Sequence, residues 1–405
     1  MPSANSLKGT KSPNKIELSR RVLSVAPSVT LAIAAKAKEM QAQGKDVVSL
    51  SAGEPDFDTP SYIKEAAVTA LQKGATKYTP AAGTIELRKA ITAKLKRDQG
   101  LSFSPDQIIV STGAKHAIFN VLFALLNEED EVVIPSPYWL SYPEMVTVLG
   151  GRSVILKTAE ATNFKLTPQI LRKGLGTKSK ILILNSPSNP TGAVYSRGEL
   201  LALVEVLKDF PKLIVLSDEI YEKLIFDGEK HYSIASFDPG IAQRTIVVNG
   251  MSKAYAMTGW RLGYAACPDR ELAQAVGSIQ SHSTSNPTSF AQAGGVAALE
   301  KGEADARKMC GVFEKRRDLF FKKIAAIPQL KPFRPQGAFY LFANSRASGL
   351  DSVTLSQKLL EEALVAVVPG KPFGSDDHIR MSFAASEALL EEAASRLASW
   401  FRKRP

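Results

Sequence analysis

Residues 249–264 read Asn249-Gly250-Met251-Ser252-Lys253-Ala254-Tyr255-Ala256-Met257-Thr258-Gly259-Trp260-Arg261-Leu262-Gly263-Tyr264 and directly follow the apolar run 245–248. Lys253 is the most informative residue of the chain, because it stands among small residues and a short distance ahead of Arg261. Most lysines are solvated surface charges, but a surface lysine rarely needs such close-packed neighbours. The pattern therefore favours an amine held in the interior, beside a cation that can bind phosphate.

Outward from this stretch, short β-branched runs alternate with longer amphipathic segments. The pattern predicts strands at 108–110, 131–134, 153–156, 180–184, 213–216, 245–248 and 263–266, and helices at 60–73, 84–98, 115–126, 138–149, 167–175, 197–209 and 268–281. Thr84, Thr167 and Ser196 are suitable N-caps for three of these helices. Several strands are apolar on both faces, which indicates an α/β fold with a mostly parallel central sheet between helices.

The pattern changes after about residue 300. It predicts a long charged helix over 303–326, a strand at 338–343, a helix at 353–363, strands at 365–368 and 379–383, and a last helix from 386. We expect residues 303–405 to form a smaller α+β domain together with 21–52, beside a larger domain over 53–302. Residues 1–20 are expected to form a flexible tail.

Composition excludes several classes of protein. The 405 residues are 44% hydrophobic, enough for two domains, and the net charge of +11 is spread among acidic residues without a basic block. Such a distribution argues against a nucleic-acid surface and fits anionic small molecules. Two cysteines argue against a disulfide framework and fit a reducing, cytoplasmic compartment. We expect no secretory signal, no membrane contact and no metal.

An acid and a phenol follow the apolar run 213–216. A carboxylate such as Asp218 can keep a pyridine nitrogen protonated, and Tyr221, one helical turn later, can donate to a ring oxygen. With Lys253 as the amine and Arg261 for a phosphate, these residues suit pyridoxal phosphate. Taken alone, Asp218 is explained equally well as a helix N-cap or a surface ion pair.

Four further features have a structural and a functional interpretation. Small residues at 111–115, between a strand and a helix, can expose N–H groups to a phosphate, although such turns are common. Asn189 lies in a Pro-rich turn that either is a plain loop, with a cis proline, or aims the amide at a ring oxygen or a carboxylate. Trp139 can stack on a flat ring or pack in the core. Arg380 interrupts an apolar strand, where it requires a substrate anion or a structural ion pair.

These residues stand in motifs that resemble the class I, fold-type I pyridoxal-phosphate aminotransferases of the aspartate aminotransferase type. The chain looks most like the bacterial and plastid subgroup that includes aspartate/prephenate aminotransferases, from about residue 21 to the C-terminus. The motifs are Ser51-Ala52-Gly53-Glu54-Pro55-Asp56-Phe57-Asp58-Thr59-Pro60, Pro137-Tyr138-Trp139, Ser188-Asn189-Pro190-Thr191-Gly192, Ser217-Asp218-Glu219-Ile220-Tyr221, Ser252-Lys253 and Arg380.

The resemblance implies how the cofactor is held. Lys253 would form the Schiff base and move the Cα proton, Asp218 would hold the ring nitrogen, and Tyr221 would hold the ring oxygen with Asn189. Tyr78 would reach the phosphate of the other subunit, so that a homodimer carries its sites at the interface. The implied cofactor-binding residues are Lys253, Gly113, Ala114, Lys115, Trp139, Asn189, Asp218, Tyr221, Arg261 and Tyr78.

The resemblance also implies how substrate is held, by Gly53, Trp139, Asn189, Arg380, Lys115, Thr30 and Ser28. Arg380 and the backbone of Gly53 would bind the α-carboxylate. The region 281–286 lacks the partner-chain arginine of animal-type enzymes, and Lys115 with Ser28 and Thr30 would bind the distal carboxylate instead. Thr30 and Lys115 accompany prephenate use in some members, but plain aspartate enzymes of the subgroup share both.

We therefore expect an aminotransferase that moves the amino group of L-aspartate or L-glutamate to 2-oxoglutarate or oxaloacetate by a ping-pong mechanism, and that also uses prephenate. The alternatives are an aromatic, alanine or kynurenine aminotransferase, a lyase on the same fold, or a non-catalytic regulator that binds the cofactor. Such regulators usually carry a winged-helix region ahead of this domain, and the residues before 21 are too few for one.

Overall fold

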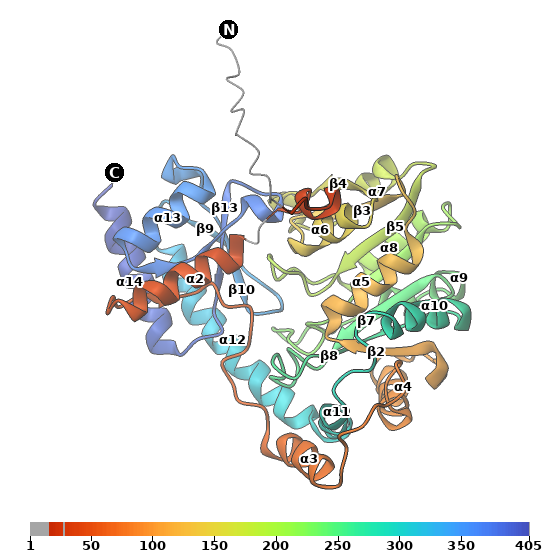
Figure 1. Ribbon diagram of the computed structural model, residues 1–405. Coiled ribbons are helices and arrows are strands. Elements are labelled where there is room, and N and C mark those ends of the chain that lie inside the picture. Colours follow the sequence, from red (N-terminus) through yellow and green to blue (C-terminus); the bar gives the residue numbers. More distant parts are fainter. Residues whose placement is uncertain (1–15, 27–28, 405) are drawn as a thin grey trace.

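The structure is a computed structural model and describes residues 16–26 and 29–404 (Figure 1). Residues 1–15 of the expected tail, and Ser28, lie outside the described residues. Two sheets organise the chain, a seven-stranded sheet built from residues 108–266 and a four-stranded sheet built from residues 331–382. The long helix α12 (Glu303–Ala325) links the two regions.

The large sheet confirms all seven strands expected over 108–266. Its order is β2 (Ile108–Thr112), β8 (Leu262–Ala266), β7 (Thr245–Gly250), β6 (Ile214–Asp218), β5 (Ser179–Asn185), β3 (Glu131–Ser136) and β4 (Arg152–Lys157). Strands β4, β3, β5, β6 and β7 pair in parallel, whereas β8 is antiparallel to both β7 and β2. The sheet is therefore mostly parallel, as the sequence predicts.

Helices cover both faces of this sheet because neighbouring residues of each strand point to opposite sides. In β7, Val247 packs in one buried cluster while Ile246 and Val248 pack in another. One face is covered by α5 (Ala114–Leu125), α6 (Ser141–Val148) and α10 (Arg270–Ser281). The other face is covered by α4 (Ile85–Gln99), α7 (Pro168–Gly174), α8 (Arg197–Leu207) and α11 (Ser289–Lys301).

The helices of this region agree with the sequence except at one place. The seven expected helices are present, including α3 (Ser61–Gln72), and Thr84, Thr167 and Ser196 each accept a hydrogen bond from the backbone three residues on. The sequence analysis placed no helix over 289–301, where α11 forms. The paired glycines Gly294 and Gly295 weaken the helical pattern there. The fold needs a small residue at this place, because a Cβ at Gly294 would lie 2.5 Å from the side chain of Trp260.

The four-stranded sheet is antiparallel throughout. Its order is β12 (Val368–Pro369), β13 (His378–Ser382), β10 (Tyr340–Asn344) and β9 (Lys331–Phe333). The strand expected over 365–368 is wrong as one element, because β11 (Val365–Ala366) pairs with β1 (Val48–Ser49) while β12 pairs with β13. The chain changes partners at Val367, so the two halves belong to different sheets.

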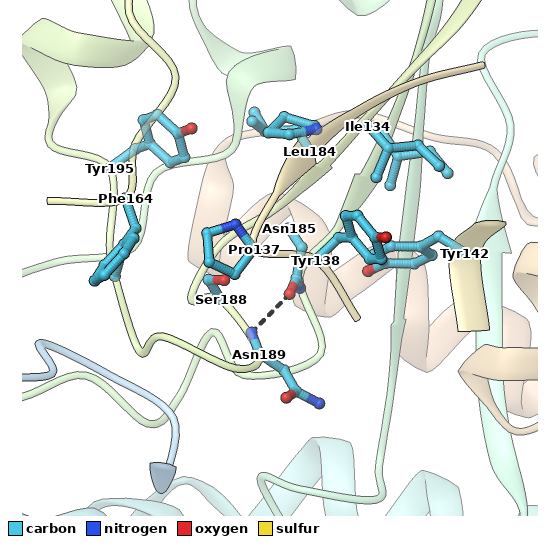
Figure 2. A pocket seen from close by; sticks show the side chains of 13 residues that line it. Ile134, Pro137, Tyr138, Tyr142, Phe164, Leu184, Asn185, Ser188, Asn189 and Tyr195 are labelled. Carbon is cyan, nitrogen blue, oxygen red and sulfur yellow. Dashed lines mark hydrogen bonds between the residues drawn. The ribbon is translucent and has the colours of Figure 1, made fainter. Parts of the chain in front are cut away.

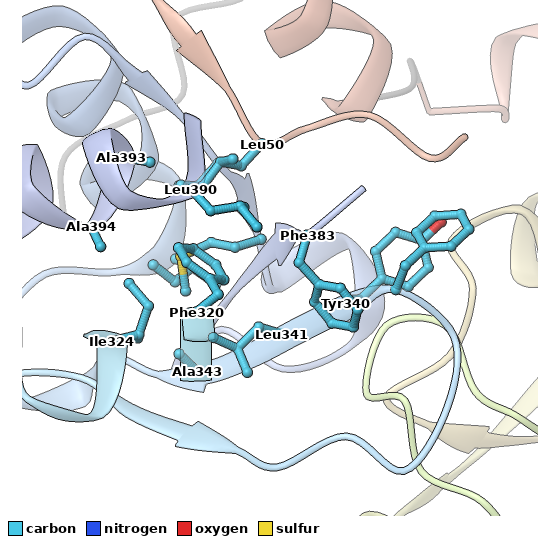
Figure 3. Close-up of a cluster of buried hydrophobic side chains, with 14 of the residues drawn as sticks. Leu50, Phe320, Ile324, Tyr340, Leu341, Ala343, Phe383, Leu390, Ala393 and Ala394 are labelled. Atoms are coloured by element: carbon cyan, nitrogen blue, oxygen red, sulfur yellow. The ribbon is translucent and has the colours of Figure 1, made fainter. Parts of the chain in front are cut away.

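Helices α12, α13 (Ser352–Glu362), α14 (Glu387–Arg402) and α2 (Val29–Ala42) pack around this sheet. The first three confirm expected helices, whereas α2 was not expected. Leu50 joins Phe320, Leu341, Phe383 and Leu390 in its buried core (Figure 3), so residues from both ends of the chain share one cluster. The shorter elements are α1 (Arg20–Leu23), α9 (Pro239–Ala242) and 3-10 turns at Pro105–Gln107, Glu160–Thr162, Ile234–Ser236, Arg346–Ser348 and Lys371–Phe373.

No helix within 16–26 and 29–404 is both long and apolar enough to cross a membrane.

A fully buried arginine fastens α12 to the loop that follows β6. The guanidinium of Arg317 donates to both carboxylate oxygens of Asp227, at 2.6 and 2.8 Å, and to the carbonyl of Pro335 at 3.1 Å. Its Nε donates to Asp318 at 2.8 Å, and the group lies 4.9 Å from the ring of Phe226. The burial and the number of these contacts indicate a strong contribution to stability.

We expect Arg317→Ala to lower the free energy of unfolding by about 2–5 kcal/mol, mainly because it removes a fully buried side chain and leaves a cavity. Arg334→Ala is the matched control, since Arg334 pairs with Asp227 and Asp318 but its side chain is 46% exposed; it should cost less than about 1 kcal/mol. Urea unfolding followed by circular dichroism measures both, and equal losses would contradict the assignment.

Candidate active site at the carboxyl ends of the strands

Residues from distant parts of the chain meet where the parallel strands end. Asn185 and Asp218 are the last residues of β5 and β6, which are paired in register, and Lys253 follows the end of β7. Because β8 is antiparallel to both its neighbours, β2 runs in the same direction as β7 and delivers Gly113 to the same edge. This edge is where α/β sheets usually bind their ligands.

Asp218 is buried, and its carboxylate is held by two donors. The Tyr142 hydroxyl donates to Oδ2 at 2.5 Å and the backbone N–H of Ile220 donates to Oδ1 at 3.3 Å. Burial raises the pKa of Asp218 to about 6. Asp218 makes no ion pair among the described residues and does not cap a helix, so both plain interpretations of it are wrong. A carboxylate in this state gains stability from a protonated base placed against it.

Tyr142 was not singled out from the sequence. Its ring packs edge-to-face on Trp139, with 5.2 Å between centroids and 87° between planes. The available signal was its place one helical turn after the aromatic pair 138–139, but only the fold shows that the hydroxyl reaches Asp218. Figure 2 shows Tyr142 and Tyr138 on one side of a small cavity, and Asn185, Ser188 and Asn189 beside it.

Tyr221 faces the same space as Lys253, although by a different local structure from the expected one. Residues 219–224 form turns with hydrogen bonds from Glu222 to Glu219 and from Leu224 to Tyr221, rather than a helical turn. The Lys253 ammonium lies 5.9 Å from the centre of the Tyr221 ring and donates to the Gly53 carbonyl. Burial lowers the pKa of Lys253 to about 8, which increases the fraction of neutral, nucleophilic amine.

An anion cradle lies at the start of α5. Gly113 has φ +87°, and a Cβ there would lie 2.4 Å from the Arg261 guanidinium, so only glycine leaves room for that side chain. Arg261 donates to the carbonyls of Thr258 and Thr112 and has no acidic partner among the described residues. The backbone N–H groups of Ala114 and Lys115, at the N-terminus of the helix, also have no acceptor among the described residues.

Lys115 adds a second cation to this cradle. Its ammonium lies 4.9 Å from the centre of the Trp139 ring. Burial, followed by the charge of Arg261, lowers the pKa of Lys115. Two cations that have no acidic partner among the described residues, beside the N-terminus of a helix, fit a phosphate. With Lys253 and Asp218 nearby, the donor set fits pyridoxal phosphate.

Arg380 lies on β13 and is buried, and the ring centres of Tyr340 and Phe373 are 4.3 and 5.1 Å from its Cζ. It donates to the side-chain oxygen of Asn189 at 3.0 Å and to the carbonyl of Ser51 at 3.2 Å. Its Nε has no partner, and no carboxylate pairs with it within the described residues. The structural ion pair that the sequence left open is therefore absent there, and a buried guanidinium of this kind favours an incoming anion.

Three further residues expected from the sequence, Asn189, Thr30 and Tyr78, differ in how far they are buried. The turn that carries Asn189 contains cis peptide bonds before Pro187 and Pro190, and the backbone N–H of Asn189 donates to Asn185 at 2.9 Å (Figure 2). Thr30 is half-buried, and its hydroxyl has no partner in the part of the chain described. Tyr78 is 90% exposed.

One buried group of possible metal ligands lies behind this edge of the sheet and comprises Glu219, Glu222 and His231. Lys94 forms an ion pair with Glu222, and the Gln99 amide donates to both carboxylates, at 2.7 and 2.8 Å. His231 lies 2.9 Å from Glu219. Since the lysine already supplies positive charge, this group is a structural network.

Known proteins resemble the chain over nearly its whole length. The family model described as aminotransferase class I and II matches residues 45–397. The chain is 47% identical to an aspartate aminotransferase of Bacillus subtilis, over 96% of this chain and 100% of that protein. It is 42% identical to an aspartate/prephenate aminotransferase of Nitrosomonas europaea, over 95% and 99%.

Solved structures give the same result. The aspartate aminotransferase of Thermus thermophilus with maleate superposes with a TM-score of 0.91 at 44% identity, over 95% of this chain and 100% of that one. An aromatic aminotransferase of Pyrococcus horikoshii superposes with a TM-score of 0.86 at 40% identity, over 91% and 99%.

Asp218→Asn tests the state of the buried carboxylate without any ligand. The folded pKa of about 6 exceeds the reference value of 3.8, so the carboxyl contributes most stability below about pH 4 and loses that contribution as the pH rises through about 6. At about pH 8 the variant of the apoprotein should be more stable than wild type, by up to about 3 kcal/mol, because the amide stays neutral and still accepts from Tyr142.

Urea unfolding of both apoproteins at about pH 8 and about pH 4 measures this difference, which should close at the lower pH. A variant that is destabilised equally at both pH values would contradict the raised pKa of Asp218.

Proposed function

The chain belongs to the class I and II aminotransferases, which use pyridoxal phosphate, and on that premise we propose that it transfers the amino group of L-aspartate or L-glutamate to oxaloacetate or 2-oxoglutarate, with prephenate as a further acceptor. Arg380 carries this proposal. It is a buried guanidinium that lies against two aromatic rings and has no acidic partner in the described chain. A substrate α-carboxylate would supply the missing charge through paired hydrogen bonds.

Specificity for dicarboxylates is assigned to Lys115. Its ammonium lies over Trp139 without an acidic partner among the described residues. A substrate held at one carboxylate by Arg380 would offer its distal carboxylate to this cation, together with Thr30 and Ser28. The names of relatives that act on aspartate, and on aspartate and prephenate, support both substrate classes.

Pyridoxal phosphate, when bound, supplies an aldehyde for an amine and a protonated ring that withdraws electrons from the substrate Cα. In the proposed mechanism Lys253 supplies that amine and, with its lowered pKa, takes the Cα proton and returns it. Asp218, held by Tyr142, keeps the ring nitrogen protonated. The Tyr221 hydroxyl and the Asn189 amide orient the ring oxygen, while Gly113, Ala114 and Arg261 hold the phosphate.

We take the working form to be a homodimer with two domains per chain, 53–302 and the combination of 21–52 with 303–405. A mostly apolar hollow beside the exposed Tyr78 supports a partner subunit there, and its lining includes Ala75, Ala293 and Val296. In the proposal Tyr78 completes the partner's phosphate site. Both cysteines are free, which is in keeping with a cytoplasmic protein.

Aromatic transamination is the second candidate, because one similar structure is an aromatic aminotransferase. Alanine or kynurenine transamination, a lyase reaction and a regulatory role without turnover are further alternatives. Turnover with a series of amino donors separates them, since only the proposed function requires a second carboxylate.

An absorbance titration of the purified holoenzyme tests the proposal. L-Glutamate should convert the absorbance of the bound cofactor to that of its amine form, and oxaloacetate should reverse the change. Reversal by prephenate as well would support prephenate as a second amino acceptor. Reversal by oxaloacetate but not by prephenate would limit the proposed reaction to transamination between aspartate and glutamate. Bound cofactor that does not respond to glutamate would overturn the proposal.

Lys115→Ala and Arg380→Ala should separate the two carboxylate sites. Lys115→Ala should lower kcat/KM about 10- to 100-fold for aspartate, through loss of a charge-assisted contact, and should lower it much less for alanine, which has no distal carboxylate. Arg380→Ala should weaken the binding of both amino donors, aspartate and alanine, by about 2–5 kcal/mol. Steady-state kinetics with aspartate and alanine measure the difference, and equal losses for both donors in Lys115→Ala would remove Lys115 from the distal site.

A further inference from the structure

Tyr340 joins two parts of the site that come from different sheets. Tyr340 begins β10 and is 1% exposed. Its hydroxyl lies 2.9 Å from the hydroxyl of Tyr221, which follows β6 of the large sheet. Its ring lies 4.3 Å from the Cζ of Arg380, on β13 of the small sheet. Figure 3 shows Tyr340 at one end of the buried cluster of the small sheet, with Leu341 and Phe383 beside it.

The hydrogen bond between the two hydroxyls can run in either direction, and each direction leaves a different proton free. Burial raises the pKa of both phenols, so each carries its proton and can donate one hydrogen bond. The Tyr340 hydroxyl has no partner other than Tyr221 among the described residues, and its remaining side faces Gly53, where a Cβ would lie 3.3 Å away. When Tyr340 donates to Tyr221, the proton of Tyr221 is free for an acceptor in the site.

With Tyr340 donating to Tyr221, both hydroxyl protons are hydrogen-bonded only when a ligand in the site accepts from Tyr221. A chain of two hydroxyls that donate in the same sense polarises the outer one, which then donates a stronger hydrogen bond. The charged groups around Tyr221 are Asp218, Lys253 and Arg380, none of which accepts from its hydroxyl in this structure. The acceptor is therefore supplied by the ligand.

The ring of Tyr340 acts separately from its hydroxyl. The Cζ of Arg380 lies over this ring and also over the ring of Phe373, at 5.1 Å, and the π-face of each ring attracts the buried guanidinium. Two hydrogen bonds, to Asn189 and Ser51, set its rotation. Since no carboxylate among the described residues pairs with Arg380, the contacts that hold its guanidinium are these two hydrogen bonds and the two aromatic rings.

We propose that Tyr340 is a positioning residue with two separable functions: its hydroxyl directs the Tyr221 proton toward the ring oxygen of the cofactor, and its ring holds Arg380 in position for the substrate carboxylate. The inference rests on the proposed roles of Tyr221 and Arg380. Tyr340 would then serve both binding events, because its side chain contacts Tyr221 beside the large sheet and Arg380 on the small sheet.

Two variants of the holoenzyme separate the functions. Tyr340→Phe keeps the ring and removes the hydroxyl; Tyr340→Leu removes both. The control is Tyr264→Phe, because Tyr264 is also fully buried but its hydroxyl has no hydrogen-bond partner among the residues that the structure describes. The first readout is the pH midpoint at which the absorbance of the bound cofactor changes without substrate. The second is the dissociation constant of maleate, a dicarboxylate that is not an amino donor, measured at a pH where the cofactor is protonated in every variant.

Tyr340→Phe should raise the midpoint by about half to one pH unit, because a weaker donor at Tyr221 favours the deprotonated ring oxygen less. Its dissociation constant for maleate should stay within about twofold of wild type, since the ring remains. Tyr340→Leu should show the same rise in midpoint together with about tenfold weaker maleate binding. Tyr264→Phe should match wild type in both.

A wild-type midpoint in Tyr340→Phe would overturn the role of the hydroxyl, and wild-type maleate affinity in Tyr340→Leu would overturn the role of the ring. If the leucine variant does not fold, Tyr340→Met, which is closer in volume, replaces it. Failure of the proposed function looks different, because the wild-type holoenzyme itself would then neither bind maleate nor respond to glutamate.

Discussion

The parallel pairing of β3 to β7 is the constraint on which the site depends. Parallel strands end at the same edge of a sheet, so the residues that follow them meet there whatever their distance in the chain. Asn185, Asp218 and Lys253 come from three such strands. Within the large sheet, β8 is antiparallel to both β7 and β2, so β2 runs in the same direction as β7 and Gly113, which follows β2, lies at this edge. The small sheet then adds Arg380 from the far end of the chain.

The cations at this edge of the sheet lack acidic partners among the described residues, whereas two buried cations elsewhere in the protein have them. Arg317 is as buried as Arg380, but two aspartates hold its guanidinium, and buried Lys94 has Glu222. At the site, Arg380, Arg261 and Lys115 have no acidic partner within the described residues. Burial of the unpaired Arg380 guanidinium costs stability, and a bound anion relieves that cost, so the same group that destabilises the apoprotein favours a ligand.

Comparison of sequence and structure shows where local patterns are sufficient. The strand pattern predicted all seven strands of the large sheet, because residues buried on both faces leave continuous apolar runs. It missed α11, whose paired glycines are poor helix formers in isolation and are required by close packing. It placed a helical turn at Tyr221 where the backbone forms hydrogen-bonded turns. It gave no reason to single out Tyr142 or Tyr340, since their neighbours along the chain carry no such signal.

The sequence by itself determined the fold class, the positions of the large sheet's strands to within about two residues, and the identities of the chemical groups, because periodicity, caps and motifs are local properties of the chain. The tertiary structure alone decided which of these groups are buried, which have partners and which face one another. Asp218 could have been a helix cap and Arg380 an ion pair until the packing of two sheets enclosed both without a counter-charge. Burial and pairing arise from contacts between segments far apart in sequence, and no local pattern records those contacts.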